Sequence, residues 1–196
     1  MEFAPQDRER SMYRTLTGTV VPRPIGWTAT TSPEGVDNLA PYSFFNVVSV
    51  APPILMFAPG VRSDGLTDTA RNVRETEEFV VNVVTRPFAE AMNETSASLP
   101  ADESEFDHAG LERAASSVVR PPRVAGVAVA YECELHDMQR VGSHHVVMGE
   151  VVRAHVDDDL LTAEGKVDVE RLDAVGRLAG DLYDTVESRF RMPRPD

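Results

Sequence analysis

The feature that most constrains the fold is an alternating run from Val127 to Leu135. One face carries Val127, Val129, Tyr131, Cys133 and Leu135, while Glu132 and Glu134 occupy the other. A period of two residues predicts a β-strand with one face against a core. A turn at Val141-Gly142-Ser143 leads into a second predicted strand, from His144 to Val156. The centre of the protein is therefore expected to be a sheet.

Further strands are predicted in the N-terminal half. Ile25 to Thr31 alternates in the same way. The following Ser32-Pro33-Glu34-Gly35 has proline and glycine at the positions that these residues favour in a tight hairpin turn. Ile54 to Ala58 and Phe79 to Thr85 are short apolar runs that predict two more strands. The stretch from Val36 to Phe45 is too polar and irregular for a clean strand.

The helical signals are few and local. Thr67 or Asp68 can cap a short helix that runs to about Thr76. A second helix is predicted from Pro87 to Ser98, and a short one near Val169 to Val175. The acidic stretch from Pro100 to Asp107 is expected to be a surface loop.

These elements predict a mainly β fold, an antiparallel barrel with a few peripheral helices. Periodicity alone equally permits a sandwich. At 196 residues the chain suits one domain, 1–196, with a core of about 12–183. The tail from Arg189 to Pro195 either covers a dimer groove or is disordered, as chain ends commonly are.

Charge and composition exclude several classes of function. The formal charge of −13 argues against nucleic acid, which needs a basic surface, and requires that any anionic ligand be held by local arginines. No apolar run approaches the roughly 20 residues of a membrane helix, and the N-terminus shows no signal peptide. Cys133 is the single cysteine, which fits a reducing compartment and a small buried residue. We expect a cytoplasmic protein.

The segment from Asn38 to Asn46 interleaves small polar and aromatic residues where a core strand should alternate. One interpretation is a barrel edge with a proline bulge. The other is an open backbone surface, whose amides and Ser43 hydroxyl bind a flat heteroaromatic ligand.

A second unusual segment runs from Arg62 to Asn72 and surrounds the predicted helix start with hydroxyls, a glycine and two arginines. Helix N-termini offer free amides and a partial positive charge, so they hold phosphates readily. An ordinary capped surface helix is the alternative interpretation.

The third segment contains His144 and His145. Neighbouring residues of a strand point to opposite faces, so these two cannot readily bind one metal ion. Cys133 with His136 is likewise poor metal spacing, and no metal is predicted. The chain also lacks a phosphate-binding glycine loop followed by lysine, a Gly-x-Ser-x-Gly turn and a Rossmann fingerprint. Any chemistry is therefore expected to belong to a bound cofactor.

At these segments the chain resembles the flavin reductase-like, FMN-binding split-barrel family. The likeness covers roughly residues 12 to 183, and its pieces are individually weak but occur in the family's order. They are Arg23-Pro24-Ile25-Gly26-Trp27, Asn38 to Phe45, Pro52-Pro53, Asp68-Thr69 with Arg71-Asn72, Glu78 to Asn82, His144 with Gly149-Glu150-Val151, and Arg177-Leu178 with Tyr183.

The resemblance implies a Greek-key split barrel that forms a homodimer, with FMN in a groove at the subunit boundary. The residues it implies near the flavin ring are Trp27, Thr28, Asn38, Ala40, Ser43 and Phe44. Those it implies near the phosphate are Arg62, Ser63, Thr67, Asp68, Thr69, Arg71 and Asn72. His144 matches a histidine beside the flavin or the incoming nicotinamide, with His145 as the alternative one residue on.

The implied activity is reduction of FMN by NADH or NADPH, with reduced flavin passed to a partner monooxygenase or another electron acceptor. Two alternatives stay open: an electron carrier or flavoenzyme with another substrate, and a binding module that has lost flavin. One departure bears on the choice, because relatives often carry a basic residue where this chain has Thr67. A hydrogen bond from such a charged group is worth about 1.5–3 kcal/mol.

Overall fold

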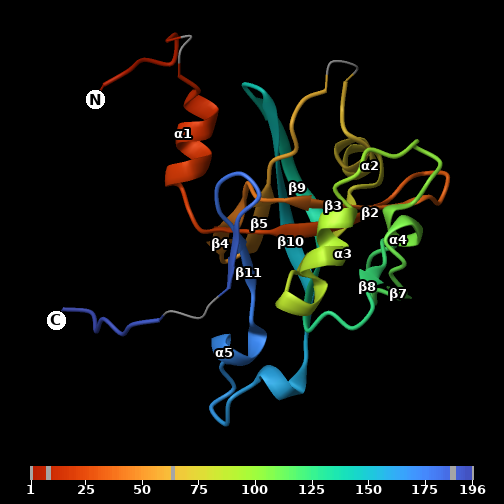
Figure 1. The fold of residues 1–196 in the computed structure, drawn as a ribbon. Coiled ribbons are helices and arrows are strands. Elements are labelled where there is room, and N and C mark those ends of the chain that lie inside the picture. The colour runs from red at the N-terminus through yellow and green to blue at the C-terminus, as the bar shows by residue number, and fades with distance from the viewer. Residues whose placement is uncertain (1, 8–9, 63–64, 186–188, 196) are drawn as a thin grey trace.

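The computed structural model describes residues 2–7, 10–62, 65–185 and 189–195. Its largest element is a seven-stranded antiparallel sheet, whose strands follow the order β3-β2-β6-β9-β10-β5-β4 (Figure 1). These strands are β2 (Gly26–Thr31), β3 (Asp37–Tyr42), β4 (Phe45–Val50), β5 (Pro53–Phe57), β6 (Glu78–Val83), β9 (Val129–Val141) and β10 (His144–Val156).

The sheet curls until its two edges meet. Seven strands about 4.8 Å apart would separate the edges of a flat sheet by roughly 29 Å. Edge strands β3 and β4 are nevertheless joined by Ser43 and Phe44 alone, and three Cα steps span at most about 11 Å. A Cβ at Gly26 would lie 2.7 Å from the ring of Phe45, so edge strand β4 also packs against β2, the neighbour of the opposite edge strand. The sheet is therefore a barrel, which decides against a sandwich.

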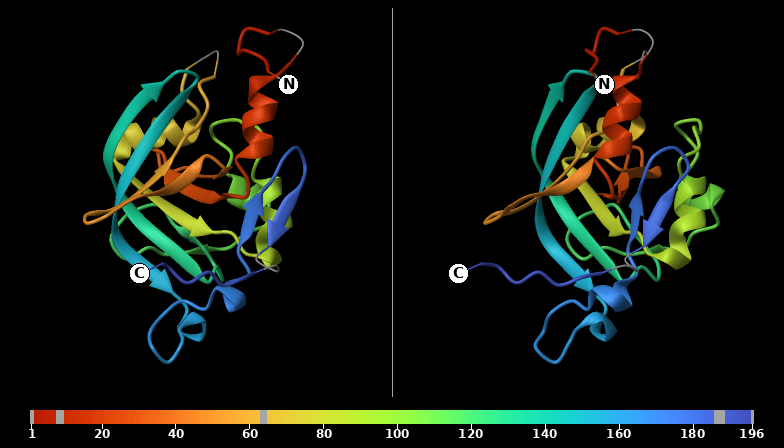
Figure 2. Two further views of the ribbon diagram at one scale, coloured as in Figure 1. Left: turned by 90° about the vertical axis from the view of Figure 1, so that its left-hand side faces the viewer. Right: turned by 60° about the vertical axis from the view of Figure 1, so that its left-hand side comes forward.

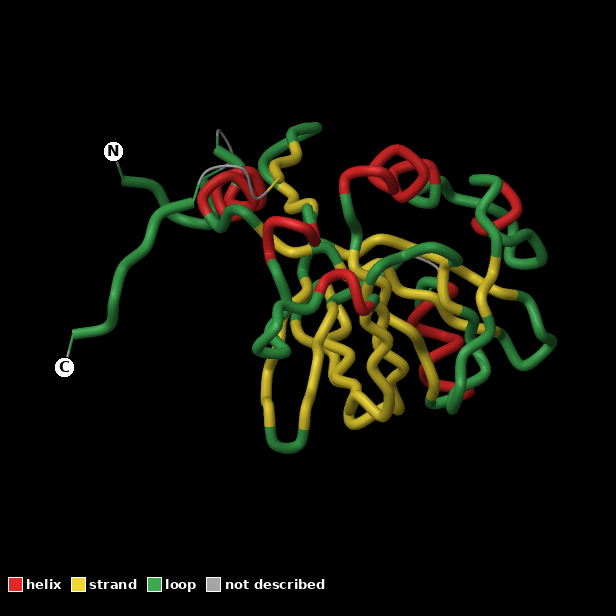
Figure 3. The backbone as a smooth tube through the Cα atoms, turned by 90° about the horizontal axis from the view of Figure 1, so that it is seen from below, coloured by secondary structure: helices red, strands yellow, loops and turns green. Residues whose placement is uncertain are grey.

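Short strands and helices surround the barrel (Figure 2). The helices are α1 (Met12–Thr19), α2 (Asp68–Thr76), η1 (Arg86–Phe88), α3 (Ala89–Glu94), α4 (Glu105–His108), η2 (Asp158–Leu160) and α5 (Val169–Leu172). In one small sheet, β11 (Val175–Arg177) lies between β1 (Arg23–Pro24) and β12 (Tyr183–Thr185). In the other, β7 (Arg113–Ala114) pairs with β8 (Arg123–Val124). Figure 3 shows both ends of the chain extending on the side that carries α1. No helix in the described ranges is long and apolar enough to cross a membrane.

The mainly β prediction is confirmed, and so are the two long strands and their turn. Cys133 is fully buried, as expected for a small core residue. Gly149 on β10 packs against β6, since a Cβ there would collide with the ring of Phe79. The helix at Asp68 also forms as predicted, with Thr67 as its N-cap.

Several boundaries were wrong. Asp37 to Tyr42 is a regular strand, β3, because Pro41 sits on the sheet's outer edge, where its missing N–H breaks no ladder bond. The second helix begins as a 3₁₀ turn at Arg86 and ends at Glu94. The stretch taken as a surface loop contains α4, whose Glu105 and Phe106 are buried. The helix at Val169 ends at Leu172, because Val175 already pairs in β11. Helix α1 was not predicted.

Candidate functional site

A cavity of about 190 Å³ lies between the edge of β3, the start of α2 and the chain that follows α3. It brings together residues from two of the unusual sequence segments. Six residues predicted to bind a cofactor line it: Asn38, Ala40, Arg62, Thr67, Asp68 and Thr69.

The start of α2 supplies most of the charge at this cavity. Asp68 pairs with Arg71 at 2.8 Å and with Arg62 at 3.4 Å. Arg62 lines the cavity together with Asp68 and Glu105, whereas Arg71 lies on the neighbouring side of the helix start. Thr67 caps the helix, because its Oγ1 accepts a hydrogen bond from the amide of Ala70 at 3.3 Å. The threonine that departs from the family pattern therefore adds no charge but fixes the helix start.

The polar side chains below the cavity are hydrogen-bonded to one another. The Tyr42 hydroxyl donates to Thr69 Oγ1 at 2.8 Å, and Thr69 donates to Asn38 Oδ1 at 2.6 Å. Asn38 Nδ2 in turn donates to Glu105 Oε2 at 2.8 Å. Burial raises the pKa of Tyr42 and that of Glu105. These bonds hold Asn38 and Thr69 in one orientation.

Glu105 also fixes the edge of the sheet. Its Oε2 accepts the amide of Leu39 at 3.0 Å, so this outward N–H of β3 is already satisfied. Pro41, the next outward-facing residue, has no N–H. The amides of Ser43 and Phe44 are therefore the remaining main-chain candidates for binding a ligand at this edge.

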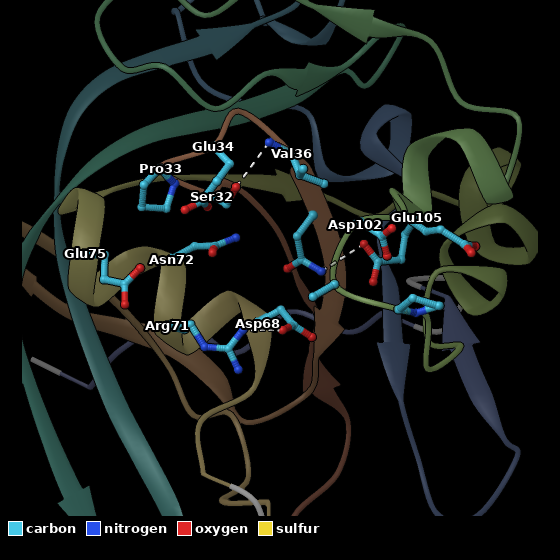
Figure 4. A pocket seen from close by; sticks show the side chains of 14 residues that line it. Ser32, Pro33, Glu34, Val36, Asp68, Arg71, Asn72, Glu75, Asp102 and Glu105 are labelled. Atoms are coloured by element: carbon cyan, nitrogen blue, oxygen red, sulfur yellow. Dashed lines mark hydrogen bonds and ion pairs between the residues drawn. The ribbon is translucent and has the colours of Figure 1, made fainter.

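Ser43 lines a second hollow of about 340 Å³, which adjoins the first cavity at Pro41 and Ser96. Arg71 and Asn72 face a third hollow of about 260 Å³, drawn in Figure 4. Glu34, Glu75 and Asp102 line that third hollow too, so its charge does not suit an anion. Asn72 is buried there and donates to Thr30 Oγ1 at 3.1 Å.

The third sequence segment reaches the same end of the barrel. The ring of Phe44 lies against that of His144, with centroids 5.1 Å apart. The amide of Val61 donates a hydrogen bond to the carbonyl oxygen of Ser143 at 2.8 Å, and the amide of His145 donates one to the carbonyl oxygen of Pro59 at 3.0 Å. His144 is thus beside Phe44 without lining either of the two adjoining hollows.

Two predicted residues lie elsewhere. Trp27 is fully buried in the core, where its Nε1 donates to Thr95 Oγ1 at 2.9 Å. Thr28 is also fully buried. Both faces of β2 are covered, and neither side chain lines the three hollows described above. Ser63 lies outside the described residues.

The residues missed by sequence reasoning are Tyr42, Glu105 and Ser96. Tyr42 stands inside the Asn38 to Asn46 segment, whose mixture of aromatic and polar residues marked it. Glu105 looked like one of many surface acids, and nothing local distinguishes it. Among the described residues, no group of three or more potential ligands could hold a metal ion.

Comparison with known proteins gives a consistent result. A family model described as flavin reductase like domain matches residues 17–170. The chain is similar to nitrilotriacetate monooxygenase component B from Bacillus cereus, with 34% identity, a TM-score of 0.94 and 98% of both chains covered.

It is also similar to the 2-nitrobenzoate 2-nitroreductase NbaA of Pseudomonas fluorescens, with 30% identity, a TM-score of 0.88, and coverage of 100% of this chain and 96% of the other. A split-barrel protein from Shewanella frigidimarina NCIMB 400 shares the fold over the full length of both chains, with 24% identity and a TM-score of 0.86. The split-barrel prediction is confirmed.

Proposed function

The chain belongs to the flavin reductase-like family, and we propose that it binds FMN and uses NADH or NADPH to reduce it. One observation carries the proposal. The edge of β3 and the arginine-flanked start of α2 meet in one cavity, and Ser43 lines the hollow that adjoins it, so that a surface for a phosphate and a surface for a ring lie side by side.

The start of α2 fits the phosphate of FMN. The amide of Ala70 donates its hydrogen bond to Thr67 Oγ1. In the first turn of the helix, the amides of Asp68 and Thr69 therefore remain as donors for a ligand. Arg62 and Arg71, which both pair with Asp68, are the guanidinium groups beside this helix start in a chain with a formal charge of −13. Helix amides and arginines together favour a phosphate group.

The turn between β3 and β4 fits the polar edge of the flavin ring. The amides of Ser43 and Phe44 are the proposed donors, which would stabilise negative charge that develops there during reduction. His144, packed on Phe44, is the proposed neighbour of the ring. A bound flavin supplies the redox chemistry, while the chain supplies position and hydrogen bonds.

Exposed apolar side chains favour a homodimer in which a second copy completes the site. Edge strand β4 exposes Val47, Val48 and Val50, and α1 exposes Tyr13 and Leu16. These apolar side chains are available to a partner.

The likeness to a monooxygenase component B favours release of reduced FMN to a partner monooxygenase. The likeness to a nitroreductase supports a second candidate, in which the flavin stays bound and another compound takes the electrons. The two candidates differ in whether flavin is a substrate or a resident cofactor.

The test begins with FMN titration of the purified protein. Binding should quench flavin fluorescence and raise the melting temperature, and a folded chain that shows neither effect contradicts the proposal. Oxidation of NADH or NADPH is then followed while free FMN or FAD is varied. A rate that saturates with free flavin supports the diffusible product. A slow rate independent of added flavin supports the resident cofactor.

A further inference from the structure

Glu105 is a buried carboxylate in the wall of the proposed phosphate cavity. Its side chain comes from α4 and the residue is only 7% exposed, whereas Asp68 comes from the start of α2. Both residues line the cavity of about 190 Å³ together with Arg62, and both also border the third hollow, drawn in Figure 4. A phosphate bound at the start of α2 would therefore share its cavity with two carboxyl groups.

The two carboxyl groups differ in their partners. Asp68 pairs with Arg71 at 2.8 Å and with Arg62 at 3.4 Å. Glu105 instead accepts hydrogen bonds from the side-chain amide of Asn38 and the main-chain amide of Leu39, and it forms no ion pair in the described part of the chain. Glu105 is therefore the carboxyl group whose negative charge an entering phosphate would oppose without a guanidinium in between.

Both hydrogen bonds to Glu105 end on the same oxygen. Asn38 Nδ2 lies 2.8 Å from Oε2, and the nitrogen of Leu39 lies 3.0 Å from it. No other described residue donates to Oε1. A proton on Oε1 would thus remove the charge of Glu105 and leave both hydrogen bonds in place.

Glu105 is also linked to the start of α2. Asn38, which donates to Glu105, accepts the hydroxyl of Thr69 at 2.6 Å, and the amide of Thr69 is one of the two proposed donors to the phosphate. A neutral Glu105 keeps this connection, because Asn38 retains its acceptor on Oε2. The protonated state is therefore compatible with an intact phosphate site.

The surroundings of Glu105 favour its protonation. Burial is the main reason that the pKa of Glu105 is raised, and the charge of Asp68 raises it further, while the hydrogen bonds from Leu39, from its own amide and from Asn38 act in the opposite direction. The other charged groups that line its two hollows are Glu34, Arg62, Arg71, Glu75, Asp102 and Glu103. Of the carboxyl groups there, Glu105 is the buried one.

The remaining titratable groups around α4 have other partners or other positions. Tyr42 on β3 keeps its proton, because burial raises its pKa. Asp37 and Asp107 both pair with Arg113, and with His108 these residues line a different hollow. The group in this cavity that can gain a proton near neutral pH is therefore Glu105.

We propose that Glu105 takes up a proton from solvent on Oε1 when the phosphate of FMN binds at the start of α2. The bound phosphate strengthens proton binding by Glu105, and by linkage the proton strengthens phosphate binding by the same factor. FMN binding should thus weaken as the pH rises, and riboflavin, which has no phosphate, should not share this dependence. The inference rests on the proposed function and makes Glu105 a residue that sets the preference for phosphorylated flavin.

The first test uses the wild-type protein alone. Calorimetric titrations with FMN and with riboflavin, at about pH 6.5 in two buffers of different ionisation enthalpy, count the protons exchanged on binding. FMN should show a net proton uptake that riboflavin lacks. The second ionisation of the phosphate, with a pKa near ~6, can only cause proton release when the dianion binds, so its effect has the opposite sign.

The second test uses Glu105→Gln, which is neutral at every pH and still offers one oxygen to Asn38 and Leu39. Fluorescence titrations from about pH 5 to about pH 8 should show that the FMN dissociation constant of wild type, relative to that of the variant, rises by up to about 10-fold per pH unit. At pH 8 the variant should bind FMN about 5-fold more tightly than wild type, because a charge that repels the phosphate is gone. Riboflavin binding should stay within about 2-fold.

The matched control is Glu103→Gln. Glu103 is exposed, lies two residues before Glu105 and loses the same charge in the variant. Its FMN affinity should follow the pH dependence of wild type. A purely structural role of Glu105 gives a different pattern, in which Glu105→Gln weakens the binding of both flavins.

The inference is overturned if wild type takes up no more protons with FMN than with riboflavin, and this measurement decides even where Glu105→Gln does not fold. It is also overturned if Glu105→Gln keeps the pH dependence of wild type or weakens the binding of both flavins. If wild-type protein binds no FMN at all, the proposed function fails and the role of Glu105 fails with it. FMN binding without proton uptake leaves the proposed function intact and removes only the role of Glu105.

Discussion

Glu132 should stabilise the fold mainly through its ionised carboxylate. The side chain is fully buried on β9 and accepts the amides of Ser117 at 2.7 Å, Val118 at 2.6 Å and Val119 at 3.0 Å. His155 Nε2 lies 2.5 Å from Oε1. Burial by itself would raise the pKa of Glu132, but the hydrogen bonds from His155 and the three amides outweigh it and lower the pKa from 4.5 to about 2.

The size of the effect follows from this difference in pKa. A carboxyl whose pKa is lower in the folded state than in the unfolded state stabilises the fold at pH values above the unfolded pKa. At about 1.4 kcal/mol per pH unit, a pKa near 2 instead of 4.5 is worth about 3 kcal/mol at pH 7. The same relation leaves about 1 kcal/mol at pH 3.

Glu132→Gln removes the charge and turns one acceptor into a donor that faces backbone N–H groups. Urea unfolding should therefore show a loss of about 3 kcal/mol at pH 7, which shrinks as the pH falls from 4.5 toward 3. Glu134→Gln is the matched control, because Glu134 lies two residues along the same strand and is exposed. Two results would refute the reasoning. One is a loss of unfolding free energy below about 1 kcal/mol at pH 7, and the other is a loss that stays the same as the pH falls.

Three other predictions concern the phosphate site, the barrel wall and the thiol. Arg71→Ala should weaken binding of FMN more than binding of riboflavin, because it removes charge from the start of α2; equal losses in fluorescence titrations would remove Arg71 from the phosphate site. Gly149→Ala should destabilise the fold by about 1–3 kcal/mol in urea unfolding, since the new Cβ collides with the buried ring of Phe79. Gly60→Ala is the control, because there is open space around Gly60. Equal effects of the two substitutions would show that the contact with Phe79 is not what requires glycine. Burial raises the pKa of the Cys133 thiol, so iodoacetamide at pH 8 should modify it only after denaturation, and rapid labelling of native protein, read by mass spectrometry, would contradict its burial.

The sequence alone determined the elements whose signals are local. The hairpin of β9 and β10 follows from alternation on both sides of Val141-Gly142-Ser143. The start of α2 follows from Thr67, whose side chain reaches an amide three residues away. Both patterns relate residues that are close together in the sequence, and the rules of periodicity and capping describe such local relations.

The identity of the buried polar residues depended on the tertiary structure. Glu105 stands in an acidic stretch that resembles any solvated surface, yet it accepts the amide of Leu39, 66 residues away. Trp27 looked available to a ligand until its partner Thr95, 68 residues away, placed it in the core. Burial of this kind is set by long-range contacts, for which a local pattern carries no signal.

The closure of the sheet was decided in the same way. Ser43 and Phe44 can join the two edge strands only because the sheet curls, and that curl brings β3, α2 and the 142–145 turn to one end of the barrel. The second hollow, which Ser43 lines, likewise exists only where β11 and β12 pack beside α3. The sequence specified which strands and helices form, whereas the cavities between them arise from packing between distant segments, since a cavity is bounded by residues that only the folded chain brings together.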